Sequence, residues 1–124
     1  MKKKVNVTVG VFLPVPVTEL MLSAVTAYYG CGKEELFGSK GYQEAARRRA
    51  ILYHLSKVEC NLGDTDIANL YGISRQSVQQ ALSRLEFETS KAVCLQSTCD
   101  VAAIRKIFAD LRLKQDQWLN QISP

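Results

Sequence analysis

The sequence has no apolar run long enough to cross a membrane. A transmembrane helix needs roughly 20 consecutive apolar residues, and the longest apolar-rich segment, from Val5 to Val17, is interrupted by polar residues and by Pro14 and Pro16. The same interruptions, and the lack of a small-residue cleavage site after an unbroken apolar stretch, make this segment a poor secretory signal. We therefore expect a cytoplasmic protein that has no contact with membranes.

Histidine and closely spaced cysteines are equally scarce. His54 is the only histidine, and the four cysteines, Cys31, Cys60, Cys94 and Cys99, form no CxxC pair. Because zinc sites need several such ligands at short spacings, we expect no metal and no other cofactor, and cysteines that are reduced and mostly buried. The spacing of His54 and Cys60 places them on different sides of a helix, and no oxyanion loop accompanies them. The sequence therefore predicts that the protein is not an enzyme.

Acidic residues are fewer than basic residues. The chain has 12 Asp and Glu residues against 16 Lys and Arg residues, which gives a formal net charge of +4 at pH 7. A basic balance favours a polyanionic partner such as DNA, although many proteins with other functions share it. The charge by itself therefore does not decide the function.

Residues 1–17 carry a strand-like pattern. From Val5 to Val11 the valines alternate with polar or small residues, which is typical of a half-buried β-strand. Two prolines keep the residues that follow extended, and the rest of the chain offers no sheet for a strand to join. Two alternatives stay open: the segment pairs with a second copy to form a homodimer, or it remains an extended arm.

Helical periodicity begins at Thr18, which can cap the first helix. The expected elements are helices over residues 18–29 and 42–59 with a short turn at 33–37 between them, a helix-turn-helix at 64–86, and a C-terminal helix at about 98–120. Ser97 and Asp100 have the spacing of a capping box for this last helix, and its outer half, with Trp118, is a second candidate for a dimer contact. We expect an all-α fold, a small helical bundle over residues 18–124, preceded by the extended or β-strand arm.

The segment DTDIANLYGISRQSVQQALSRLE carries the strongest motif in the chain. We expect Asp64 to cap its first helix, Gly72 to adopt the left-handed conformation that the turn requires, and Ser74 to cap the second helix. The same residue types also fit a helical hairpin inside a bundle that serves as a protein-interaction adaptor.

The apolar residues expected to face the core include Ile51, Leu52, Leu55, Val58, Ile67, Leu70, Val78 and Leu85.

The second helix of this motif presents hydrogen-bonding side chains and almost no acid. Arginine bonds bidentately to guanine and glutamine to adenine, and the N-terminal residues of a recognition helix reach base edges in the major groove. We expect base contacts from Arg75, Gln76, Gln79 and Gln80. Contacts with the DNA backbone are expected from Ser74, Ser77 and Arg84. The motif therefore predicts sequence-selective binding to double-stranded DNA, with the adaptor as the alternative.

Five short stretches of the chain have an order and spacing that point to a known family. They are AYYG followed by KEELFGSK, then ARRRAILYHL, DIANLYG and SRQSVQQA. With these stretches, the chain from Val17 to about Leu113 resembles the C-terminal DNA-binding domain of the bacterial replication initiator DnaA, whose fold is related to that of the Trp repressor. In that family, basic side chains of the loop before the long helix enter the minor groove. The resemblance implies that Lys40, Arg47 and Arg49 lie near the minor groove or the DNA backbone.

Two departures from the family change what the resemblance implies. Residues 74–77, SRQS, stand where the family has Asp-His-Thr-Thr, and only the last of them is a conservative replacement, so the family's base preference is not implied. The chain also has no GxxxxGK[ST] phosphate-binding loop, and we expect the ATPase module of the initiator to be absent. The resemblance therefore implies a freestanding relative, either a transcriptional regulator or a regulator of replication or of a mobile element.

Overall fold

A computed structural model describes residues 15–38, 42–90 and 95–122. Within these ranges every regular element is an α-helix, as the periodicity predicted. The helices are α1 (Val17–Tyr29), α2 (Lys33–Phe37), α3 (Tyr42–Cys60), α4 (Asp64–Tyr71), α5 (Arg75–Ser90) and α6 (Leu95–Ile122). The all-α class is therefore confirmed, whereas the expected N-terminal strand lies outside the described residues.

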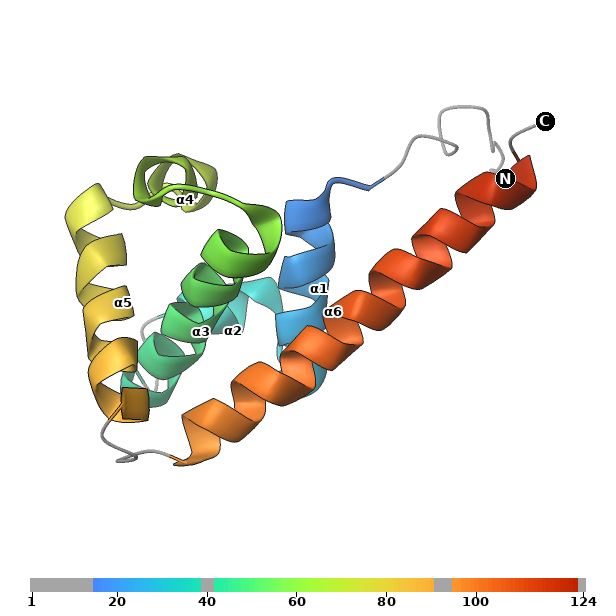
Figure 1. Cartoon of the computed structure of the whole chain (residues 1–124). Helices are drawn as coiled ribbons and strands as arrows, with labels where there is room; N and C mark the ends of the chain where they lie inside the picture. Colours follow the sequence, from blue (N-terminus) through green and yellow to red (C-terminus); the bar gives the residue numbers. More distant parts are fainter. Residues whose placement is uncertain (1–14, 39–41, 91–94, 123–124) are drawn as a thin grey trace.

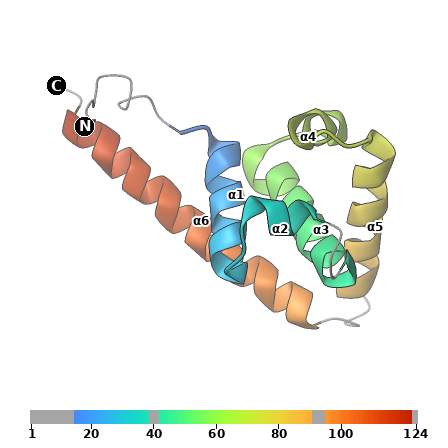
Figure 2. The same ribbon diagram turned by 180° about the vertical axis from the view of Figure 1, so that it is seen from behind.

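The helices pack around α3. Figure 1 shows α5 on one side of α3 and α1 on the other, with α6 crossing α1. The short helix α2 packs on α3; it lies behind α3 in Figure 1 and in front of it in Figure 2. The helix α4 joins α3 to α5. The largest fully buried side chains come from α1 to α6 and form one core: Met21, Leu36, Ile51, Leu52, Leu55, Ile67, Val78, Ile104 and Phe108. This core fixes the position of α5 relative to the rest of the bundle.

The helix α6 is longer than α1, the helix with which it makes most of its contacts. It has 28 residues and α1 has 13, which correspond to lengths of about 42 Å and about 20 Å. The first half of α6 packs on the bundle, and its C-terminal half extends beyond the other helices (Figures 1 and 2). Despite this length, none of the described helices is long and apolar enough to cross a membrane.

A reciprocal hydrogen-bonded pair holds the segment before α1 against α6. The backbone N–H of Val15 donates to Gln115 Oε1 at 2.9 Å, and Gln115 Nε2 donates to the carbonyl oxygen of Val15 at 3.2 Å. A carboxamide offers one donor and one acceptor in the geometry of a peptide group. The side chain of Gln115 therefore satisfies both backbone groups of Val15.

The start of α1 differs from the expectation. The helix begins at Val17, so Thr18 lies inside it and makes no capping hydrogen bond. The carbonyl of Pro16 accepts the backbone N–H groups of Glu19 and Leu20, at 3.0 and 3.2 Å. Because proline has a φ angle that suits this position and needs no donor partner, the backbone makes the first turn without a side-chain cap.

The cap of α4 also differs from the expectation. Gly63 is the cap residue, and its backbone N–H donates to Asp66 Oδ2 at 3.2 Å. Asp64, which the sequence predicted as the cap, is instead the first residue of the helix. Its carboxylate is therefore available for contacts with neighbouring helices.

Most of the residues predicted to be buried are buried, with two exceptions. Val58 and Leu70 are 54% and 45% exposed, because each lies in the last turn of its helix, where fewer neighbours cover it. The cysteines differ in part from the expectation too, since Cys31 and Cys60 are half-buried free thiols and Cys99 is exposed on α6.

Candidate nucleic-acid interface

The connection between α4 and α5 is a three-residue turn. Gly72 has a φ of 68°, a left-handed conformation that side chains rarely adopt, so the glycine predicted here is required by the backbone. The backbone N–H of Ile73 donates to the carbonyl of Ala68 at 3.0 Å, and the side chain of Ile73 packs against the core. The turn is thus fixed by one backbone conformation and one apolar contact.

The serine predicted to cap the second helix does so. Ser74 Oγ accepts the backbone N–H of Ser77 at 3.0 Å, and the Ser74 hydroxyl donates to Ser77 Oγ at 2.8 Å. Such a cap satisfies one of the free N–H groups at a helix start. Both serines are exposed, so the N-terminal end of α5 faces solvent with two hydroxyl groups.

The helix α5 has one buried face and one exposed face. Val78 and Leu85 are buried at 0% and 4% exposure, with Ala81 and Leu82 half-buried beside them. The exposed side chains along the rest of the helix are Arg75, Gln76, Ser77, Gln79, Gln80, Ser83, Arg84, Glu86 and Phe87. The fold therefore brings together on one helix all the base-contacting residues that the sequence predicted, with Ser77 and Arg84.

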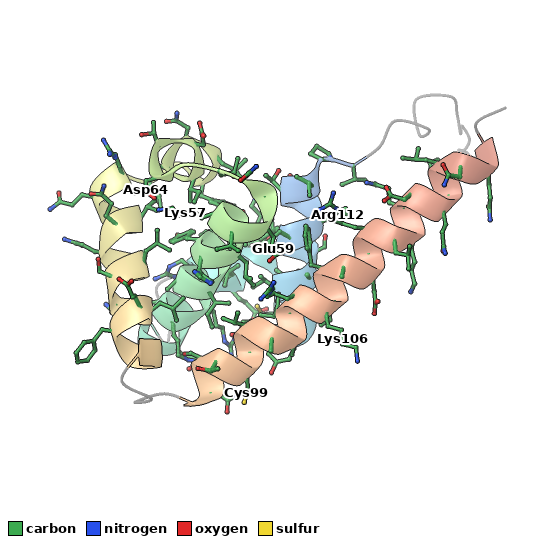
Figure 3. All side chains as sticks on the ribbon, in the orientation of Figure 1. Lys57, Glu59, Asp64, Cys99, Lys106 and Arg112 are labelled. Carbon is green, nitrogen blue, oxygen red and sulfur yellow. The ribbon has the colours of Figure 1, made fainter. Side chains whose placement is uncertain are left out.

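One of these predicted residues is turned toward α4. Gln79 Nε2 donates to Asp64 Oδ2 at 3.4 Å, and Lys57 Nζ of α3 lies 3.1 Å from Asp64 Oδ1. Figure 3 shows Lys57 and Asp64 facing each other between α3 and α5. The hydrogen bond from Lys57 is the main reason why the pKa of Asp64 lies below its usual value. The contacts of Asp64 link three helices, and they occupy the carboxamide of Gln79.

Arg47 occupies a different place from the one that the family resemblance implied. Its Nη1 lies 2.9 Å from Asp100 Oδ2 and 3.2 Å from Ser97 Oγ, and its Nε lies 3.2 Å from Glu44 Oε1. The side chain is only 15% exposed. Because its donors are occupied by Asp100, Ser97 and Glu44, we assign Arg47 to the packing of α3 against α6 and leave it out of the interface.

Asp100 is the centre of this buried polar cluster. Its carboxylate accepts hydrogen bonds from the hydroxyls of Tyr28 and Tyr29, at 2.8 and 2.7 Å, and from Gln96 Nε2 at 2.8 Å, in addition to Arg47. The sequence suggested a capping box here, but α6 begins at Leu95, so Asp100 lies inside the helix and is fully buried. A buried carboxylate is stable only when donors surround it, and here α1, α3 and α6 supply them.

The same contacts shift the protonation of the cluster. Burial works to raise the pKa of Asp100, but the hydrogen bonds from Tyr29, Tyr28, Arg47 and Gln96 outweigh it and hold that pKa below its usual value. Burial and the hydrogen bond to Asp100 raise the pKa of Tyr29, and the hydrogen bond to Asp100 raises the pKa of Tyr28. Asp100 is therefore ionised, and both tyrosines are protonated, at neutral pH.

Arg49 also makes contacts inside the molecule. Its Nη1 donates to the carbonyl oxygens of Leu36 and Gly38, at 2.8 and 3.3 Å, and so holds the end of α2 against α3. The neighbouring Arg48 lies with its guanidinium 4.4 Å from the centre of the Tyr29 ring. Lys40, the other residue that the resemblance assigned to the DNA, lies outside the described residues. Among the described residues, the candidate interface therefore consists of Ser74 and the exposed face of α5.

Comparisons with known proteins gave no relative. No protein-family model matches the chain, and neither the curated proteins nor the solved structures contain a match.

Proposed function

We propose that the protein is a sequence-selective regulator that binds double-stranded DNA, in which α4 and α5 form a helix-turn-helix and α5 is the recognition helix. The observation that carries this proposal is the exposed face of α5. From Arg75 to Arg84 it presents guanidinium, amide and hydroxyl groups and no carboxylate. Such groups match the donors and acceptors of base edges and the phosphate oxygens beside them.

The exposed positions suggest a division of roles along α5. Arg75 and Gln76, in the first turn, and Gln80, one turn later, are proposed to contact bases, because the N-terminal part of a recognition helix lies deepest in the major groove. Gln79 is proposed to contact a base once its long hydrogen bond to Asp64 has been exchanged for one to DNA. The proposed phosphate contacts come from Ser74, Ser77 and Arg84.

Two copies are proposed to bind two half-sites. A single helix-turn-helix offers a small interface, and dimers of such proteins read half-sites about one helical turn apart. The C-terminal half of α6, which extends beyond the bundle, is the described segment proposed to bring two copies together; the N-terminal strand, outside the described residues, is the alternative. Sedimentation of the protein with its selected DNA site measures this directly, and one copy per palindromic site would contradict the dimer.

The resemblance to the DnaA DNA-binding domain also favours a DNA-binding function. A freestanding relative of the DnaA DNA-binding domain would act as a transcriptional regulator or as a regulator of replication or of a mobile element. The four residues SRQS at 74–77 differ from that family's signature, so we propose that this protein recognises a DNA sequence different from the one that the family recognises.

Selection from a random-sequence duplex library tests the proposal. The protein is incubated with the library at two salt concentrations, and the retained DNA is sequenced. The expected result is an enriched motif and an affinity that falls steeply with salt, with a log–log slope of about −0.9 for each phosphate neutralised. Salt-sensitive retention without a motif would contradict base reading by α5. No retention at low salt would contradict DNA binding and would favour the protein-interaction adaptor.

A further inference from the structure

The residues before α1 meet the part of α6 that extends beyond the bundle. At the C-terminal end of α1, Tyr28 and Tyr29 donate to Asp100, which lies in the second turn of α6. Just before the start of α1, Val15 is hydrogen-bonded to Gln115, near the other end of α6. Followed backwards through α1, the chain therefore runs along α6 toward its C-terminal end. Figures 1 and 2 show the segment that enters α1 coming from that side.

The protruding half of α6 has one side that is partly covered. Leu111, Gln115 and Leu119 are spaced four residues apart, so they share one side of the helix, and all three are half-buried. On the opposite side, Leu113 is 56% exposed. Trp118 and Leu119 come three and four residues after Gln115 and therefore lie beside it, one turn farther along. An apolar pair thus follows the bond to Val15 on the same side of α6.

The sequence just before Val15 is apolar and has few backbone donors. Phe12 and Leu13 precede Pro14, and neither Pro14 nor Pro16 has a backbone N–H group. The N–H of Val15, between the two prolines, already donates to α6. A segment that packs on an apolar surface withdraws its N–H groups from water, which costs free energy wherever they find no acceptor. The two prolines remove most of this cost, so the segment suits an apolar surface.

The length of this segment matches the distance that it has to cover. A helix rises about 1.5 Å per residue, so the last residue of α6, Ile122, lies about 10 Å beyond Gln115. Extended backbone advances about 3.3 Å per residue, so three residues span the same length. Residues 12–14 therefore have the length to run from Val15 to the end of α6, past Trp118. The valines of the strand-like pattern come earlier in the chain and are not needed for this contact.

We propose that Phe12, Leu13 and Pro14 pack on Trp118 and Leu119 of the same chain and hold the protruding half of α6 against the start of α1. The occupant of this surface is thus a segment of the protein itself. The opposite side of α6 is left for the second copy that the proposed function includes. The contact within one chain does not depend on DNA binding.

Fluorescence tests the contact, because Trp118 is the only tryptophan of the chain. Acrylamide quenching is measured on the full chain, without DNA, over a wide range of protein concentrations. We expect quenching that does not change with concentration, because the cover belongs to the same chain. The double variant Phe12→Asp with Leu13→Asp should raise the quenching constant about twofold, since a charged side chain does not stay packed on an apolar ring. Val5→Asp with Val7→Asp adds the same charges earlier in the chain and should behave like the original.

A second pair of variants tests the bond that directs the segment. Gln115→Ala removes both hydrogen bonds to Val15 and should also raise the quenching of Trp118. Gln117→Ala makes the same chemical change at an exposed position on the opposite side of α6 and should leave the quenching unchanged. Circular dichroism checks that each variant is as helical as the original chain, so that quenching reports local cover and not unfolding.

The outcomes separate this proposal from the proposed function. Equal quenching of the original chain and of the variant at Phe12 and Leu13 would overturn the contact. Quenching that increases on dilution would assign the cover to a second copy, and an equal increase in the variant at Val5 and Val7 would contradict the assignment to residues 12–14. Because no DNA is present, either failure leaves the DNA-binding proposal untouched. Likewise, a chain that selects no DNA motif would leave the fluorescence result standing.

Discussion

Arg47 Nη1 lies 2.9 Å from Asp100 Oδ2 in an ion pair whose side chains are 15% and 1% exposed. These two residues come from α3 and α6, and the hydroxyls of Tyr28 and Tyr29 of α1 and the carboxamide of Gln96 also donate to the carboxylate. An ion pair withdrawn from water in this way contributes to stability only while both partners are present. The junction of the three helices therefore depends on one buried carboxylate.

Replacing this carboxylate should destabilise the fold. The change Asp100→Asn removes the buried charge that faces Arg47 and leaves the half-exposed Glu44 as the remaining acidic partner of this guanidinium. We expect the free energy of unfolding to fall by about 3 kcal/mol. Urea unfolding followed by circular dichroism measures it, with Asp110→Asn, an exposed residue of the same helix, as the control. If the two variants unfold at the same urea concentration, the cluster does not stabilise the fold.

The same residue gives the stability a pH dependence. The pKa of Asp100 in the folded chain lies below its usual value, and in the unfolded chain it is about 3.9. The unfolded chain binds this proton more readily, so the contribution of Asp100 is complete above about pH 4 and is lost as the pH falls through the lower, folded value. Midpoints of urea unfolding across this range should show a deficit of Asp100→Asn that is constant at neutral pH and shrinks in acid. A deficit that grows in acid would contradict the sign of the shift.

The cap of α5 can be separated from the proposed phosphate contact. Because Ser74 Oγ accepts the N–H of Ser77, Ser74→Ala should cost about 1 kcal/mol of stability, whereas Ser74→Asp keeps a capping oxygen and should cost little. The new carboxylate would face phosphate, so Ser74→Asp should weaken DNA binding although the fold is intact. Ser23→Asp, an exposed change on α1, is the charge-matched control in a fluorescence-anisotropy titration. Equal DNA affinities of the two aspartate variants would remove Ser74 from the interface.

Arg75 should determine which base is preferred at one position of the DNA site. This side chain is exposed at the start of α5, and if it bonds to a base, Arg75→Ala should cost about 1–3 kcal/mol of binding free energy and relax specificity at one position of the site. Repeating the library selection with Arg75→Ala measures both effects. Lys106→Ala removes the same charge from the exposed surface of α6 and should leave the motif unchanged. An unchanged motif with Arg75→Ala would show that α5 is not oriented as proposed.

The parts of the fold that could be predicted from the sequence are those with a local cause. Gly72 is needed for a left-handed turn, and Ser74 is needed to accept the backbone N–H of Ser77 three residues later. Both residues can therefore be recognised in the sequence without knowledge of the fold. The buried face of α5 follows in the same way from the spacing of its apolar residues. These features together placed the candidate interface on α5.

The features that could not be predicted depend on partners far away in the sequence. Arg47 and Asp100 are 53 positions apart, and Tyr28 and Asp100 are 72 apart. From its sequence neighbours alone, Arg47 is predicted to be an exposed basic residue and Asp100 to be part of a helix cap. Only the packing of α1, α3 and α6 shows that the two side chains neutralise each other. A groove between α3, α5 and α6 could not be predicted either, because its lining residues come from four separate helices, α3, α4, α5 and α6.

The contact between Val15 and Gln115 has a consequence for synthesis as well as for structure. Its two partners are 100 positions apart, so a ribosome must complete most of α6 before the contact can form. Closing a flexible loop of this length costs conformational entropy, and the cost is smaller when the intervening helices are already packed. Residues 15 and 16, which lead into α1, can therefore be held against α6 only late in synthesis, although they are among the first of the described residues to be made.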